Sequence, residues 1–151
     1  MKKRWILFII YFIVISFISL WLIRAFNSRY LDDVNPEIPC EVQLLEKADV
    51  FYVIPILNNE SIANNSEWCK QILSYNKTLG MHGVYHTFNE FLIDRDQEYL
   101  EQGKKAFEEC FGFLPKEFKP PQLRISLNNK KLKLQTFFLL QEPKMLLMQN
   151  I

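Results

Sequence analysis

The chain reads Thr-Leu-Gly-Met-His-Gly-Val-Tyr-His from residue 78 to residue 86, a short apolar segment that runs into a histidine pair. We expect a strand over Thr78–Met81 that ends at His82. His82 and His86 are the only histidines among 151 residues. Imidazole is the commonest metal ligand at neutral pH, and residues four apart face the same side of a helical turn. The pair therefore indicates a metal site, which needs a third protein ligand.

Strand and helix candidates alternate on both sides of this segment. Val50–Ile54 is a β-branched and aromatic run, typical of a strand that is buried on both faces. Further strands are expected near residues 27–31 and within 118–126, and helices over residues 41–47, 67–75, 94–111 and 128–135. This alternation predicts an α/β fold with a parallel sheet and covering helices. In such folds the active site lies at the carboxyl ends of the strands.

Polar residues follow the expected strands and should converge on one rim of the sheet. Asp32-Asp33 ends the first strand candidate, Asn58-Asn59 follows the second, and the histidines follow the third. Asp33 can complete an open triad with His82 and His86 that suits zinc, iron or another divalent ion. Such an ion polarises a substrate carbonyl and acidifies a water, while Asp32 can act as general base. A pair of aspartates is otherwise a common turn or helix-cap feature.

The N-terminus contains a long apolar segment. Trp5 to Ile23 is an uninterrupted run of 19 residues, enough to cross about 30 Å of hydrocarbon at about 1.5 Å per residue. A signal peptide has a shorter apolar region and small residues at its cleavage site, whereas this run ends in Trp21-Leu22-Ile23-Arg24. We therefore expect one transmembrane helix through residues 5–23. A cleaved signal peptide and a buried soluble helix are the alternatives.

The basic residues predict the orientation of this helix. Lys2, Lys3 and Arg4 precede it, while Arg24 and Arg29 follow it. More positive charge on the first side places the N-terminus in the cytoplasm and the remaining chain outside, as a single-pass membrane protein. Three Asn-x-Ser/Thr sequons are compatible with that side, and they begin at Asn59, Asn64 and Asn76.

Composition limits the remaining possibilities. A formal net charge of +1 argues against a nucleic-acid partner. With residues 1–23 set aside, 128 of the 151 residues remain, which is one domain with a real core. The three cysteines are Cys40, Cys69 and Cys110. They are too few for a disulfide scaffold, and they allow one disulfide and one free thiol without indicating the pair.

Three segments together resemble the successive motifs of polysaccharide deacetylases. They are residues 32–36, residues 82–86 and residues 112–121, and the similarity runs from about Tyr30 to about Pro121. The nearest branch has an Asp-Asp-Val first motif and a His-Gly-x-x-His second motif. The resemblance implies an incomplete (β/α) barrel and metal-dependent hydrolysis of an N-acetyl group on a sugar. It also implies that Asp32 is the catalytic base and that the metal ligands are Asp33, His82 and His86. Pro120 and Pro121 would form a wall of the substrate groove. The proline pair can equally be a rigid loop.

The chain departs from the family pattern in two ways. The family uses a later histidine to protonate the leaving amine, and this chain has none after His86. A full barrel of this type needs about 200 residues or more. We therefore expect a basic end with the anchor over residues 1–24, a partial deacetylase-like domain over residues 25–140, shortened at its C-terminal side, and a tail over residues 141–151.

Three functional hypotheses follow from these patterns. The first is a membrane-anchored hydrolase that deacetylates a polysaccharide or glycan with a divalent metal ion, for which zinc is the first candidate. The second is a catalytically incompetent remnant or carbohydrate-binding module of the same fold, which the missing acid favours. The third is a membrane-tethered structural protein with incidental histidines.

Overall fold

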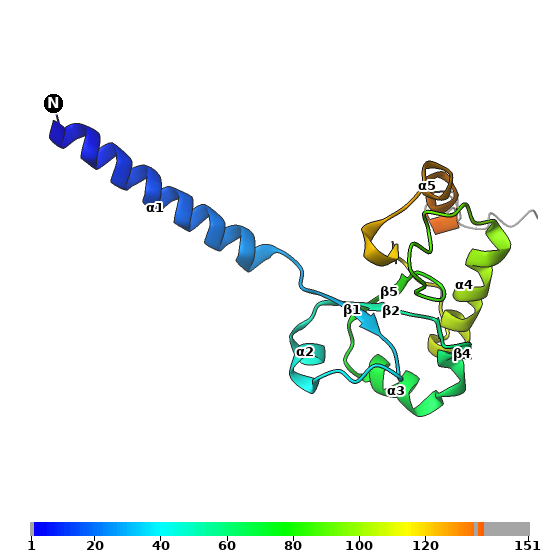
Figure 1. The fold of residues 1–151 in the computed structure, drawn as a ribbon. Helices are drawn as coiled ribbons and strands as arrows, with labels where there is room; N and C mark the ends of the chain where they lie inside the picture. Colours follow the sequence, from blue (N-terminus) through cyan, green and yellow to red (C-terminus); the bar gives the residue numbers. More distant parts are fainter. Residues whose placement is uncertain (1, 135, 138–151) are drawn as a thin grey trace, which may run out of the picture.

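The computed structural model describes residues 2–134 and 136–137. Helix α1 spans Lys2–Phe26 and projects away from the rest of the protein (Figure 1). Within it, the span Arg4–Phe26 contains an 18-residue window with a mean hydropathy of 2.9, and none of that window is buried. The helix is thus long and apolar enough to cross a membrane, as expected for residues 5–23. A signal sequence near an N-terminus has the same properties.

A four-stranded parallel sheet forms the centre of the domain. Its strands lie in the order β1 (Tyr30–Val34), β2 (Val50–Val53), β5 (Thr78–His82) and β6 (Phe118–Lys119). All four residues of β2 are buried, which confirms the strand predicted over Val50–Ile54. A separate ribbon pairs β3 (Ile56–Leu57) with β4 (Glu60–Ser61) in the antiparallel sense.

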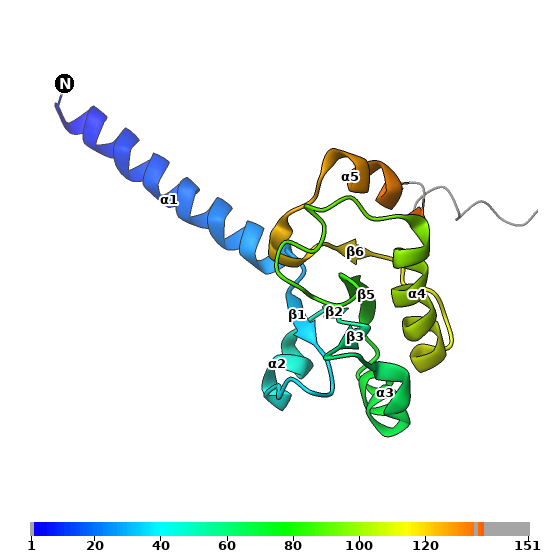
Figure 2. The same ribbon diagram turned by 45° about the vertical axis from the view of Figure 1, so that its right-hand side comes forward.

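The expected helices are present and surround the sheet. They are α2 (Val42–Lys47), α3 (Ser66–Ser74), α4 (Gln97–Phe111) and α5 (Leu127–Leu134), with short 3₁₀ turns at Ile62–Asn64 and Pro121–Leu123. In Figure 2, α4 lies beside β5 and β6, while α2 lies beside β1. Strands joined by helices on a parallel sheet confirm the predicted α/β class.

The N-cap of α4 differs from the one that the sequence favours, which is Asp94 with Gln97 three residues later. Asp96, rather than Asp94, caps α4, and its carboxylate accepts a hydrogen bond from the Tyr99 amide at 2.8 Å. The Asp94 carboxylate instead accepts hydrogen bonds from Ser126 and Asn128, at the start of α5. Because these partners are distant in the sequence, local pattern alone could not indicate them. Gly112 ends α4 with φ of 79°, as expected of a glycine C-cap.

Two strand boundaries also differ, and one of them affects the site. The first strand covers Tyr30–Val34 rather than residues 27–31, so Asp32 and Asp33 lie inside it. The strand expected within residues 118–126 is only Phe118–Lys119, because Pro121 begins a 3₁₀ turn. Proline lacks the amide proton that would continue the ladder.

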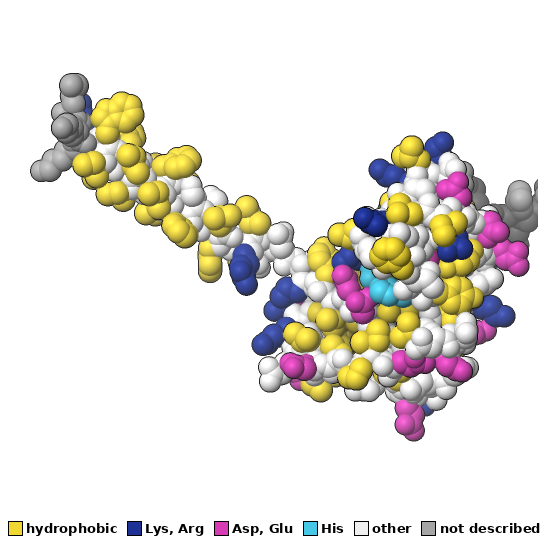
Figure 3. Space-filling view, in the orientation of Figure 1, with side chains coloured by type: hydrophobic (Ala, Val, Ile, Leu, Met, Phe, Trp, Pro, Cys, Tyr) yellow, Lys and Arg dark blue, Asp and Glu magenta, His cyan; other side chains and the backbone are white. Residues whose placement is uncertain are grey.

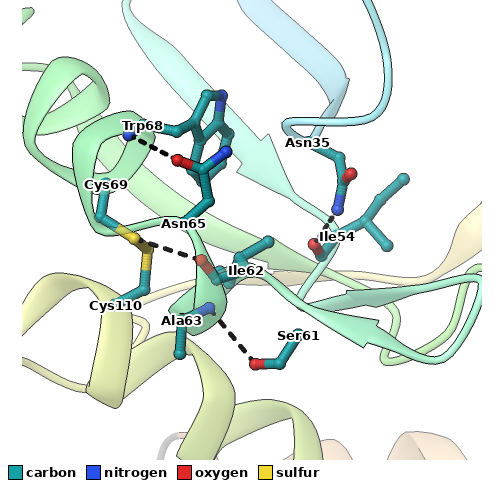
Figure 4. The surroundings of a disulfide bond; sticks show 9 residues. All are labelled: Asn35, Ile54, Ser61, Ile62, Ala63, Asn65, Trp68, Cys69 and Cys110. Carbon is teal, nitrogen blue, oxygen red and sulfur yellow. Dashed lines mark hydrogen bonds between the residues drawn. A yellow bond between two sulfur atoms is a disulfide. The ribbon is translucent and has the colours of Figure 1, made fainter.

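The core packs the sheet against α3 and α4, and a disulfide joins these two helices. Fully buried side chains include Phe51, Val53, Ile62, Met81 and Phe107. Cys69 and Cys110 are bonded with their α-carbons 5.5 Å apart (Figure 4), while Cys40 is free and exposed. Tertiary structure thus selects the pair that the sequence left open.

The sheet is open within residues 2–134 and 136–137, where β1 and β6 are its edge strands. This confirms the expectation of an incomplete barrel. Residues 141–151, expected to form a tail, lie outside the described residues. The boundaries at residues 24 and 140 remain predictions.

We predict that loss of the disulfide lowers the free energy of unfolding by about 4 kcal/mol, the chain-entropy value for a closed loop of 41 residues. Thermal unfolding of Cys69→Ser should show a clear fall in Tm, with Cys40→Ser as the matched control that keeps the wild-type value. Equal Tm values for the two variants would contradict the assigned pairing.

Candidate metal centre

An irregularity in β1 aims Asp33 toward the histidines. The pairing of β1 with β2 shifts register between Leu31 and Val34, and Asp33 has φ of 59°. This left-handed conformation is uncommon for a residue other than glycine, although aspartate tolerates it better than most. Side chains in a regular strand alternate between faces, so the bulge redirects Asp33. Its carboxylate then reaches across β2 to the end of β5.

His82 is the last residue of β5 and is almost completely buried. Its Nδ1 lies 3.0 Å from the carbonyl oxygen of Lys119 on β6. A carbonyl only accepts hydrogen bonds, so Nδ1 carries the proton and Nε2 presents a lone pair. Burial lowers the pKa of His82, which favours the neutral ring that binds metals.

His86 returns to the same point through a tight loop. Gly83 and His86 have φ values of 68° and 56°, so residues 83–86 do not form the helical turn that the spacing indicated. The two imidazole rings nevertheless lie with their centroids 5.0 Å apart. The expected proximity is present, but a loop with left-handed residues produces it.

The three expected ligands form a compact cluster. Asp33 Oδ1 lies 2.9 Å from His86 Nε2 and 3.3 Å from His82 Nε2. All three donor atoms lie within 4.8 Å of one another. Ligands of a tetrahedral zinc ion, with bonds of about 2.1 Å, are about 3.4 Å apart. The His82 lone pair also faces a carboxylate oxygen, an arrangement that a cation between them would stabilise. The donor set therefore fits a divalent metal ion.

A buried glutamate, which the sequence pattern did not reveal, holds the histidine loop. Glu90 is 1% exposed, and its carboxylate accepts hydrogen bonds from the amides of Val84, Tyr85 and His86 at 2.9, 2.9 and 3.1 Å. The Tyr99 hydroxyl donates a fourth at 2.8 Å. Burial and this bond raise the pKa of Tyr99, so its hydroxyl remains a donor. Glu90 thus satisfies the backbone amide donors of the loop that carries His86.

Gly83 allows this loop to pack closely. A Cβ added at this position would overlap the Glu90 carboxylate and the ring of Pro121. Its positive φ is also a conformation that favours glycine. The glycine between the histidines is therefore required by both backbone geometry and space.

Asp32 points to a different partner from Asp33. The Lys119 ammonium lies 2.8 and 2.6 Å from the two carboxylate oxygens of Asp32. It also lies 5.1 Å from the ring centroid of Tyr52 and 5.9 Å from that of Tyr30. Lys119 therefore contacts Asp32 through its side chain and His82 through its carbonyl. Figure 3 shows acidic side chains directly beside histidine on this face of the domain.

The other predicted site residues lie in different surroundings. Pro121 is buried and closely approaches Gly83, while Pro120 is half-buried at the end of β6. Their role as a groove wall remains a prediction. Asn58 and Asn59 form the turn of the β3–β4 hairpin, with φ of 50° and 67°. The Asn58 amide donates to the Glu37 carboxylate at 2.7 Å.

We predict that Glu90→Gln lowers the free energy of unfolding by about 2–3 kcal/mol, because an amide donor then faces a buried backbone donor. Metal affinity should fall as well, since His86 loses its anchor. The matched control is Tyr99→Phe, which removes one hydroxyl and should cost about 1 kcal/mol. Denaturant unfolding and metal titration measure both effects. Wild-type behaviour of the glutamine variant would contradict the role of Glu90.

Solved structures resemble this fold. A crystal structure of the Bc1960 peptidoglycan N-acetylglucosamine deacetylase aligns with a TM-score of 0.55 at 18% identity, covering 73% of this chain and 53% of that chain. The Xyl-CE4 domain of a multidomain xylanase from the hindgut metagenome of Trinervitermes trinervoides aligns with a TM-score of 0.51 at 17% identity, covering 69% and 52%.

The chain spans about half the length of these solved structures. No protein-family model and no curated protein sequence matches it significantly. The likeness nevertheless extends over 73% and 69% of this chain. The resemblance to polysaccharide deacetylases is therefore confirmed at the level of the fold: the chain has an incomplete (β/α)-barrel fold similar to that of the solved peptidoglycan deacetylase.

Proposed function

We propose that this chain is a membrane-anchored, metal-dependent deacetylase that hydrolyses N-acetyl groups of a polysaccharide or glycan. The observation that carries the proposal is the cluster of Asp33, His82 and His86 with Asp32 beside it. These residues lie at the carboxyl side of a parallel sheet with the fold of a peptidoglycan N-acetylglucosamine deacetylase.

Each residue has a distinct role in this proposal. Asp33, His82 and His86 would hold a divalent metal ion, with zinc as the first candidate. This ion would act as a Lewis acid that polarises the acetyl carbonyl. Asp32 accepts the proton of the attacking water. A carboxylate has about four lone-pair sites, and the Lys119 ammonium takes one on each oxygen. Asp32 thus keeps free lone pairs while Lys119 sets its orientation.

The membrane location is also part of the proposal. We assign residues 1–24 to the basic end and anchor and residues 25–140 to the extracytoplasmic domain. The Cys69–Cys110 disulfide supports that side, because disulfides persist in oxidising compartments. The three acceptor asparagines of the sequons are exposed, as this location allows.

A carbohydrate-binding module of the same fold, without turnover, is the second candidate. One observation favours it: both histidines of the chain serve as proposed ligands, so neither is free to protonate a leaving amine. Acetate release distinguishes the two candidates, since a binding module would hold both metal and glycan without producing acetate.

We predict that the full chain in detergent binds about one zinc ion and that Asp33→Asn and His82→Ala each abolish this binding, because each removes one of three ligands. The matched control is Asp32→Asn, a substitution of the same kind at the adjacent residue, which should keep the metal. Metal content after dialysis measures the effect. Stoichiometric zinc in the Asp33 and His82 variants would overturn the assignment.

We predict that Asp32→Asn lowers the rate of acetate release from N-acetylated oligosaccharides by about 10²–10⁴-fold, the usual loss for a general base. Lys119→Met should reduce kcat while leaving zinc affinity unchanged, because its carbonyl still holds His82. Lys119→Arg should restore part of the loss, since an arginine can pair with the same carboxylate. A full rate in Asp32→Asn would exclude Asp32 as the base.

A further inference from the structure

The connection between α1 and the candidate metal centre is very short. Helix α1 ends at Phe26, and Asp33 follows seven residues later. A chain spans at most about 3.6 Å per residue, so the α-carbon of Asp33 lies no more than about 25 Å from that of Phe26. This limit is covalent and holds for every orientation of the domain.

The connection also has little slack. The Asn27 amide still donates to the carbonyl of Ile23 in α1 at 3.0 Å. Arg29 is already attached to the domain: its amide donates to the Asp49 carboxylate at 2.8 Å, and its guanidinium donates to both carboxylate oxygens. The Arg29 carbonyl in turn accepts from the amide of Asp49. Only Ser28 lies between these two attachments.

The helix does not provide a stalk either. The apolar span Arg4–Phe26 has 23 residues, which is about 34 Å of helix at about 1.5 Å per residue. The hydrocarbon core of a bilayer is about 30 Å thick. Almost all of α1 is therefore needed to cross the membrane, and the domain begins at its surface.

We propose that the substrate is an N-acetylated sugar of a glycan attached to a membrane lipid, in the same bilayer as the protein. This inference rests on the proposed function and on α1 as an uncleaved anchor. The acetyl group must approach the cluster, which is confined to within about 25 Å of the helix end. A lipid-attached sugar is confined to the same layer, which raises its effective concentration at the site. A polymer held farther from the bilayer does not reach the cluster.

The test reconstitutes the full chain in vesicles and compares three forms of one N-acetylglucosamine oligosaccharide. The oligosaccharide is attached to a lipid in the same vesicles, attached to a lipid in separate vesicles, or free in solution. A reach variant carries 30 Gly/Ser residues between Asn27 and Ser28, with a root-mean-square length of about 30 Å. A control variant carries the same insert between Met1 and Lys2, on the other side of the helix.

We expect acetate release from the same-vesicle lipid to exceed that from separate vesicles by about tenfold or more. The reach variant should raise the rate on separate vesicles, whereas the control variant should behave like the wild type. The wild type, the reach variant and the control variant should hydrolyse the free oligosaccharide at equal rates, because the insert does not touch the site. Equal wild-type rates on the two vesicle arrangements would overturn the inference and leave the proposed function standing.

A second measurement does not depend on activity. Co²⁺ bound at Asp33, His82 and His86 should quench a fluorophore on lipid headgroups, and the reach variant should reduce this quenching while the control variant retains it. Equal quenching by the reach variant and the wild type would overturn the inference. If neither the wild type nor either variant releases acetate from the free oligosaccharide, the proposed deacetylase activity would instead be overturned. Release of a domain without α1 from cells would overturn the anchored arrangement.

Discussion

The candidate centre depends on the hydrogen bonds that the buried carboxylate of Glu90 accepts from the histidine loop. A loop that turns back on itself leaves its amides without partners, and burying them unpaired would cost about 1–3 kcal/mol each. Glu90 accepts from three consecutive amides, at Val84, Tyr85 and His86. Its negative charge is in turn stabilised by these donors and by the Tyr99 hydroxyl. This mutual satisfaction allows His86 to adopt a left-handed backbone and face His82.

A second connection runs through β6. Lys119 binds His82 with its carbonyl and Asp32 with its ammonium, so a two-residue strand orients a proposed metal ligand and a proposed base together. The bulge in β1 complements this arrangement, because it separates the directions of Asp32 and Asp33. Adjacent carboxylates on different partners can take different chemical roles. The site is thus assembled from three strands that are distant in the sequence.

The residue types at the candidate site and the alternation of strands and helices could be predicted from the sequence, whereas the supporting contacts could not. The buried run at Val50–Ile54 identified β2 because apolar patterning is local. The clustering of Asp33 with His82 and His86 followed from the parallel-sheet expectation. Glu90 lies in a loop with no local pattern, and its partners depend on how that loop folds. The helical explanation for the histidine spacing was wrong, because Gly83 permits a tighter turn than a helix.

The sequence by itself determined the apolar helix at the N-terminus, the α/β class and the three residues that cluster at the candidate site, because hydropathy, alternation and residue chemistry are properties of short segments. Only the tertiary structure decided which cysteines pair, that Lys119 faces Asp32, and that Glu90 holds the histidine loop. The disulfide and the Lys119–Asp32 contact join residues that are 41 and 87 positions apart, and they form only when the elements of the fold are packed together. The Glu90 contacts span only four to six positions, but they depend on the left-handed residues that turn the loop back on itself. The local sequence supplies the reactive and polar side chains, and the tertiary packing determines which groups they contact.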